Sequence, residues 1–96
     1  MPADVAKVEV RVPPILRKYT GGANNVSGEG ATVIALIDDL DWQHPGLKNE
    51  IITPDGSVHR FINVYRNGED IRYLERLNTP LSRGDVVAIL PAVAGG

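Results

Sequence analysis

The chain of 96 residues is long enough for one small domain and too short for two. It carries 10 basic and 12 acidic side chains, which give a formal net charge of −2, and the basic residues are spread from Lys7 to Arg83. Proteins that grip a phosphate backbone concentrate positive charge, so nucleic acid is not expected as a partner. The absence of cysteine excludes disulfides, thiolate metal sites, thiol catalysis and a persulfide on a side chain.

Membrane insertion and secretion are not expected either. The longest uninterrupted apolar stretch, residues 86–94, has nine residues and includes Pro91, whereas a membrane-spanning helix needs about 20. The first residues lack the basic segment and apolar run of a secretory signal. We therefore expect a cytoplasmic protein without a membrane partner.

The N-terminal third is predicted to form two strands. Residues 7–12 alternate charged side chains with three valines, and this period of two places the valines on one face of a strand. Pro13 and Pro14 end it, and residues 15–22 are expected to form a loop that closes on two glycines. A short second strand is predicted over residues 23–27, ending at the Gly-Glu-Gly sequence that follows.

The middle of the chain predicts the main helix. Thr32 is the expected N-cap, because its hydroxyl can accept a hydrogen bond from an amide of the first turn. Apolar residues then recur at helical spacing and form one stripe: Val33, Leu36, Ile37 and Leu40. Three aspartates are expected to face mostly water: Asp38, Asp39 and Asp41. Pro45 and Gly46 end the helix, and residues 47–52 predict a further short helical turn.

Three strands are predicted in the second half. Residues 61–66 alternate in polarity and are rich in aromatic and β-branched side chains. Asn67-Gly68 follows and indicates a two-residue hairpin, because both residues tolerate positive φ; the return strand is expected over residues 69–73. After an irregular stretch at residues 74–80, a final strand is predicted over residues 86–90.

This order of two strands, one helix and three strands predicts an α+β fold, the ubiquitin-like β-grasp, with a mixed sheet of about five strands and one main helix across one face. We expect residues 1–91 to form this domain and residues 92–96 to form a flexible C-terminal tail. The predicted core consists of Val8, Val10, Leu36, Ile37, Leu40, Ile62, Val64, Leu81, Val87 and Ile89.

The usual catalytic and metal-binding groups give only weak signals. His44 and His59 lie 15 residues apart without a metal-binding spacing, so we interpret them as surface histidines and expect no metal. Gly21-Gly22 lacks the spacing of a phosphate loop and is interpreted as an ordinary loop. The aspartates of the helix are interpreted as a solvated face. Trp42 is expected to pack in the core or at its rim, with partner contact as the alternative.

The last five residues, Ala92, Val93, Ala94, Gly95 and Gly96, are small, apolar and uncharged. One interpretation is a frayed end, as in most domains. The other is a segment that enters a narrow channel in another protein, since six residues from Pro91 span roughly 20 Å when extended. The Gly96 carboxyl would then need activation, most simply by ATP to an acyl-adenylate, and paired glycines would let enzyme loops approach it closely. Composition alone leaves both interpretations open.

Three parts of the chain carry a resemblance to a known family. Residues 81–96 (LSRGDVVAILPAVAGG) resemble the end of the bacterial sulfur-carrier proteins related to the molybdopterin-synthase small subunit and the thiamine sulfur carrier. Residues 12–17 with 19–22, residues 59–65 and residues 89–96 are most similar to the sulfur carrier of the thiocarboxylate-dependent cysteine pathway. Molybdopterin carriers commonly have Pro-Pro where this chain has Pro91-Ala92, which also favours the cysteine type. The resemblance spans nearly the whole chain.

The resemblance implies a carrier protein and not an enzyme, with no cofactor bound by the chain itself. An E1-like activating enzyme would use ATP to adenylate Gly96, and sulfur would replace AMP to give a C-terminal thiocarboxylate. A cysteine synthase dependent on pyridoxal phosphate (PLP) would present an aminoacrylate for that sulfur to attack, and a metalloprotease would release cysteine. Residues 92–96 would enter the active sites of these partners.

Phe61 and Tyr65 are candidates for a partner-docking face, because they lie on the side of the predicted strand opposite Ile62 and Val64. The alternative is that they cover the sheet within the monomer. Other functions also stay open: a molybdopterin-synthase small subunit, a thiamine-type carrier, a modifier joined to lysine as ubiquitin is, or an interaction module with an inert tail.

Overall fold

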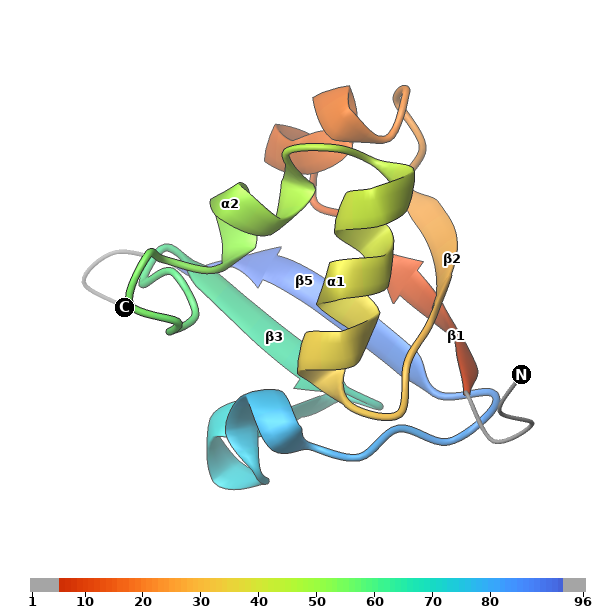
Figure 1. Cartoon of the computed structure of the whole chain (residues 1–96), viewed down its shortest axis with the longest axis vertical. Helices are drawn as coiled ribbons and strands as arrows, with labels where there is room; N and C mark the ends of the chain where they lie inside the picture. Colours follow the sequence, from red (N-terminus) through yellow and green to blue (C-terminus); the bar gives the residue numbers. More distant parts are fainter. Residues whose placement is uncertain (1–5, 93–96) are drawn as a thin grey trace.

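One mixed sheet contains five strands: Lys7–Arg11 (β1), Asn25–Glu29 (β2), Ile62–Arg66 (β3), Glu69–Asp70 (β4) and Val86–Pro91 (β5). The computed structural model describes residues 6–92 (Figure 1). The strands lie in the order β2-β1-β5-β3-β4. The last strand in sequence, β5, is therefore the central one, parallel to β1 and antiparallel to β3.

Helices complete the described part of the chain: Val33–Gln43 (α1), Leu47–Ile51 (α2) and the 3₁₀ helices Pro14–Tyr19 (η1), Ile71–Tyr73 (η2) and Arg76–Asn78 (η3). α1 crosses one face of the sheet, and α2 follows it on the same side (Figure 1). The predicted β-grasp, with five strands and one main helix, is confirmed.

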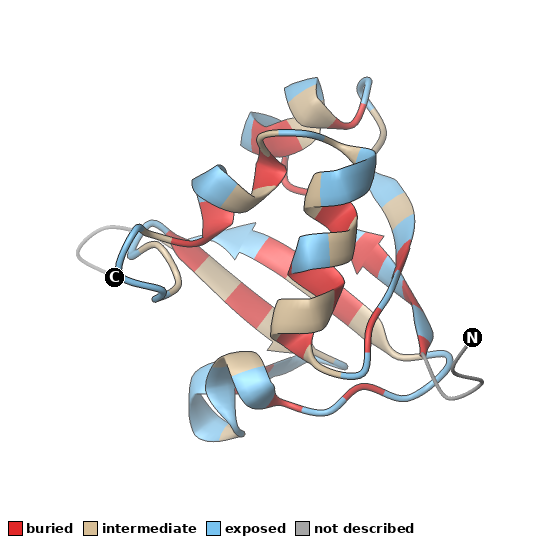
Figure 2. Ribbon diagram, in the orientation of Figure 1, coloured by how far each residue is buried: buried red, intermediate tan, exposed pale blue. Residues whose placement is uncertain are grey.

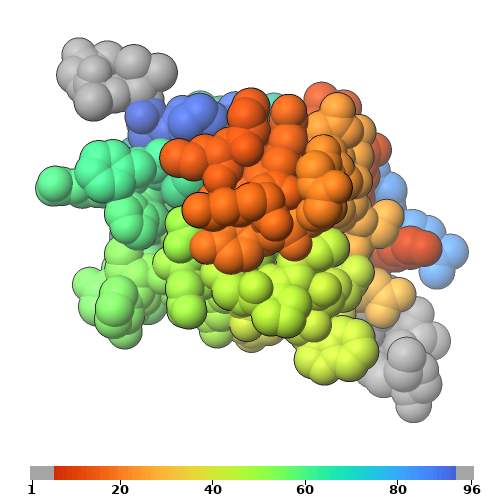
Figure 3. Space-filling model, turned by 90° about the horizontal axis from the view of Figure 1, so that it is seen from above, coloured from red at the N-terminus to blue at the C-terminus, as the bar shows by residue number. Residues whose placement is uncertain are grey.

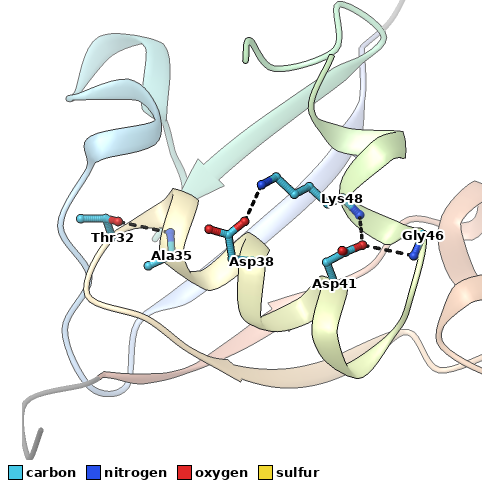
Figure 4. Close-up of polar contacts among 6 residues, drawn as sticks. All are labelled: Thr32, Ala35, Asp38, Asp41, Gly46 and Lys48. Atoms are coloured by element: carbon cyan, nitrogen blue, oxygen red, sulfur yellow. Dashed lines mark hydrogen bonds and ion pairs between the residues drawn. The ribbon is translucent and has the colours of Figure 1, made fainter. Parts of the chain in front are cut away.

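α1 begins where the sequence predicts. The Thr32 hydroxyl accepts a hydrogen bond from the Ala35 N–H at 3.3 Å and so caps the first turn (Figure 4). The predicted apolar stripe is buried, as are all ten residues of the predicted core. Figure 2 shows the buried positions gathered where the helices meet the sheet. Burial of this stripe, more than helix propensity, holds so short a helix in place.

Two aspartates of α1 join it to α2 (Figure 4). The Asp41 carboxylate accepts hydrogen bonds from the backbone N–H groups of Gly46 at 3.1 Å and Lys48 at 3.0 Å. Asp38 forms an ion pair with the Lys48 Nζ at 2.6 Å. Gly46 has a φ of 98°, which permits the sharp turn between the helices. The prediction of a merely solvated acidic face is thus wrong for the half-buried Asp41. Its carboxylate accepts hydrogen bonds from N–H groups at the start of α2, which have no carbonyl partner within that helix.

The third aspartate of this helix covers the edge of the sheet. Asp39 Oδ2 accepts hydrogen bonds from the backbone N–H of Glu29 at 3.0 Å and from Gln43 Nε2 at 2.8 Å. Gln43 Nε2 also donates to the backbone oxygen of Ser27 at 3.2 Å. Two backbone groups on the outer edge of β2 are therefore paired with helix side chains, which blunts an edge that could otherwise accept a foreign strand.

Two predicted elements differ from the structure. Residues 15–22, expected as a loop, contain most of η1, whose Leu16 is 2% exposed. The return strand expected over residues 69–73 stops at Asp70, because the chain turns into η2 and buries Ile71. In both places one apolar side chain reaches the core from a short 3₁₀ helix, which is too short to leave a periodic pattern in the sequence.

Trp42 does not pack in the core or at its rim, and that prediction is wrong. Its side chain is 83% exposed. Trp42 lies nine residues after Val33, and at about 100° per residue this places it on the side of α1 opposite the buried stripe. Helical geometry alone would have shown that the indole faces away from the sheet.

The second strand runs two residues later than predicted and includes a glycine that was expected to end it, Gly28. A Cβ at Gly28 would lie 2.7 Å from a side-chain carbon of Leu36. At Gly30, which follows the strand, a Cβ would lie 2.4 Å from the Leu36 backbone nitrogen. Both glycines therefore mark the close approach of α1 to the sheet and its following loop, not a break in the strand.

We predict that Gly30→Ala lowers the free energy of unfolding by about 3 kcal/mol, because the added methyl group meets helix backbone that cannot rotate away. Gly28→Ala is the matched control and should cost about 1 kcal/mol, since the Leu36 side chain can change rotamer. Urea unfolding followed by circular dichroism measures both values. Equal stabilities of the two variants would contradict this account of the glycines.

Candidate functional site

The end of the central strand positions the predicted tail. β5 is paired on both sides, and its inward residues Val87 and Ile89 are each 2% exposed. Beyond β5, the Ala92 N–H donates a hydrogen bond to the Phe61 backbone oxygen at 2.9 Å. The predicted tail residues Val93, Ala94, Gly95 and Gly96 lie outside the described residues. The structure therefore fixes the chain up to the residue from which the tail starts.

Pro91 fits at this point because of how the neighbouring strands end. β1 ends at Arg11, opposite Ala88, so Pro91 lies beyond the β1 ladder. Its missing N–H costs no hydrogen bond on that side, which is the usual situation of proline in a sheet. On the other side Pro91 stands opposite Ile62 of β3. β3 thus guides the chain for longer than β1 does.

The sheet face away from α1 carries the predicted docking residues. Phe61 is 56% exposed, and Tyr65 is half-buried opposite Ala88. Leu90 of β5, on the same face, is 42% exposed and stands opposite Asn63. Alternation places β3 residues Ile62 and Val64 on the buried side. An aromatic and aliphatic surface thus leads along β5 to the chain end, although its role in docking stays a prediction.

Two shallow grooves flank this chain end and share Leu90 and Pro91 in their walls. The groove towards η1 has a volume of about 390 Å³ and contains Arg11 and Arg17. Arg17 Nε donates to the Val12 backbone oxygen at 3.1 Å. No acidic side chain lines this groove.

The groove towards β3 has a volume of about 440 Å³ and contains Arg60 and Arg72, again without an acidic side chain in its lining. Arg72 Nη2 lies 2.8 Å from Asp70 Oδ2, and Asp70 Oδ1 also accepts the Arg72 backbone N–H at 2.9 Å. These hydrogen bonds, above all those from the guanidinium, hold the pKa of Asp70 below its usual value despite its burial. The arginine is thereby fixed while most of its side chain stays exposed.

Sequence reasoning missed this charge cluster. The four arginines come from three separate parts of the chain, and the sequence shows them only as spread basic residues. The sheet order brings β1 and β3 to the two sides of β5, and this places the arginines around one point. The expectation of no local positive cluster is therefore wrong for the chain end.

The two histidines belong to different segments of the fold. His44 caps the end of α1, and the ring of half-buried His59 lies 5.3 Å from that of Phe61. His59 Nδ1 has no hydrogen-bond partner within residues 6–92. Over the same residues no group of three or more His, Asp and Glu side chains could hold a metal ion, and no helix is both long and apolar enough to cross a membrane.

The sequence and the fold of this chain are similar to those of known proteins. The model of the ThiS family matches residues 10–96. The chain is 46% identical over 91 residues to sulfur carrier protein CysO from Mycobacterium tuberculosis, covering 93% of this chain and 98% of CysO. The crystal structure of that CysO has a TM-score of 0.87 at 44% identity, with 90% of this chain and 99% of CysO covered.

Two further relatives extend the comparison. The crystal structure of an Amycolatopsis orientalis BexX/CysO complex matches with a TM-score of 0.85 and 47% identity, covering 93% of this chain and 99% of that one. Small archaeal modifier protein 1 from Haloferax volcanii is 38% identical over 72 residues, or 75% of this chain and 77% of that protein. These relatives are named as carriers or modifiers, not as enzymes. The chain belongs to the ThiS family, with the ubiquitin-like β-grasp fold of CysO.

Proposed function

We propose that this chain is a sulfur carrier, adenylated and then thiocarboxylated at Gly96, that donates sulfur for cysteine biosynthesis. The observation that carries the proposal is the 46% identity to CysO over nearly the full length of both chains. Pro91-Ala92 in place of Pro-Pro supports the cysteine pathway over the molybdopterin pathway. The chain has no cysteine, so sulfur can be held only at the terminal carbonyl carbon.

The fold supplies a rigid base for this chemistry. Ala92, the last of the described residues, is hydrogen-bonded to Phe61, and four residues follow it in the sequence. These four residues reach about 14 Å when extended, enough to carry Gly96 into a partner's active site. The terminal carboxylate attacks ATP at phosphorus and expels pyrophosphate, and a sulfur nucleophile then displaces AMP from the acyl carbon. Because the two terminal glycines have no side chains, loops of the activating enzyme can approach the reacting carbonyl group closely in both steps.

Partners supply everything else in the cycle. We propose an E1-like enzyme that binds ATP, a PLP-dependent cysteine synthase that provides the aminoacrylate acceptor, and a metalloprotease that releases the cysteine. The chain itself binds none of these cofactors. Because one carboxylate serves each step in turn, the partners must bind the carrier one after another.

A second candidate function, protein modification, is favoured by the similarity to small archaeal modifier protein 1. Both functions begin with the same adenylate, and they diverge only in what attacks it. Mass spectrometry of the protein from its own cells separates them. Thiocarboxylation adds about 16 Da to the free chain, whereas modification leaves branched Gly-Gly adducts on lysines of other proteins.

We predict that one alanine added after Gly96 lowers the adenylation rate at least about a hundredfold, because the carboxylate moves roughly 3.5 Å from the reacting nucleotide. Pyrophosphate release with the activating enzyme of the same organism measures the rate. An alanine added before Met1 is the control and should have no effect. A normal rate with the C-terminal extension would refute transfer at the chain end.

We further predict that Phe61→Ser or Tyr65→Ser weakens binding of the activating enzyme about tenfold, because each removes an aromatic contact from the open sheet face. Trp42→Ser is the matched control, since it removes an aromatic residue that is 83% exposed on the helix side. Isothermal titration calorimetry gives the affinities and thermal unfolding the stabilities. Lower stability with unchanged affinity would instead assign the two aromatics to covering the sheet.

A further inference from the structure

Four arginines surround the point where the tail leaves the sheet, and we call them the arginine collar: Arg11, Arg17, Arg60 and Arg72. Figure 3 shows the end of β5, in blue, next to both the orange residues of η1 and the green residues near position 60. The chain as a whole is acidic, with 12 acidic side chains against 10 basic ones. Arg11 and Arg72 pair with Glu9 and Asp70, so the collar keeps a net positive charge at the root of the tail, opposite in sign to the net charge of the whole protein.

On the β3 side, both collar arginines are held in place before any partner binds. Arg72 is fixed by Asp70, as described above. The Arg60 guanidinium lies over the Phe61 ring, 5.3 Å from its centroid. Arg60 forms no ion pair within residues 6–92. Arg60 is thus positioned without an ion-pair partner among these residues, and a side chain that is already positioned loses little entropy when it binds an anion.

On the β1 side the arrangement is similar. Arg17 is anchored through Nε to the backbone of Val12. Arg11 Nε contacts Glu9 at 3.4 Å, in an exposed pair that contributes little energy in water. Collar arginines thus line the grooves on both sides of the chain end.

The length of the tail determines which part of the activating enzyme lies next to the collar. About 14 Å of extended chain separates Ala92 from the reacting carboxylate, so the nucleotide lies too far away to touch the collar. The collar instead faces the mouth of the channel that the tail enters. We propose that carboxylate side chains at the mouth of the activating enzyme's channel bind the arginine collar. This inference rests on the proposed function, because it assumes that the tail enters such a channel.

A ring of charge at this position has two physical effects. Opposite charges at the mouth raise the rate of association and orient the carrier with its tail towards the channel. Arginine suits this role because its planar donors pair with carboxylates in a bidentate way. The tail can then stay uncharged and narrow, while the charged contacts form outside the reaction site.

The test uses adenylation kinetics with the full chain and the activating enzyme of the same organism. Arg60→Glu should raise the KM for the carrier about tenfold and leave kcat and the KM for ATP unchanged. Arg17→Gln should act in the same direction with a smaller effect. Arg83→Glu is the matched control, because this exposed arginine lies in the turn before β5, at the other end of the strand. High salt should shrink the effect of Arg60→Glu.

The outcomes distinguish failure of the collar proposal from failure of the proposed carrier function. Normal adenylation of the wild-type chain with an unchanged KM for Arg60→Glu, at an unchanged melting temperature, would overturn the collar while the carrier function stands. An altered KM for ATP would assign the collar to nucleotide phosphate and overturn the carboxylate partner. No adenylation of the wild-type chain would overturn both proposals. Rescue of Arg60→Glu by a lysine in place of an acidic residue at the channel mouth would support the ion pair directly.

Discussion

The pairing of β5 on both sides is the constraint on which the rest of this molecule depends. β5 is last in sequence but central in the sheet, so it joins the N-terminal hairpin to the C-terminal half of the fold. Its buried residues, Val87 and Ile89, prevent a shift in register, because a slip of one residue would turn them to the open face. The chain end is thus positioned by the central strand of the sheet, which is paired on both sides.

The helices cover only one face of the sheet, so the two faces can serve different purposes. The helices bury one face, with Gly30 allowing α1 to approach closely and Asp41 joining α1 to α2. The other face has no covering element within the described residues, and it leads along β5 to the tail. Stability therefore comes from one side of the sheet, and a partner can use the other without competing with the core.

The sequence predicted the elements that local patterns determine. It did not predict the features that depend on contacts between residues far apart in the chain. Alternation, the Thr32 cap and the Asn67-Gly68 hairpin are local signals, and all appear in the structure. Leu16 and Ile71 enter the core from short 3₁₀ helices, so no periodicity in the sequence revealed them. The arginine collar was hidden for a related reason, since only the sheet order brings its members together. The tail's chemistry came from resemblance, because composition alone left a frayed end equally open.

The small, uncharged tail also explains why recognition must lie in the folded domain. A segment that enters a narrow channel can carry few distinguishing groups, and Gly95-Gly96 has no side chains at all. Successive partners that accept the same tail can then discriminate between carriers only through surfaces within reach of its root. Phe61, Tyr65 and the collar are surfaces of this kind, since they lie beside the end of β5. The strands paired with β5 hold them in fixed positions relative to the tail. A few residues of chain thereby separate the surface that partners recognise from the carboxyl group that reacts. The sequence of the reacting end can then stay the same while the surface around the root of the tail changes.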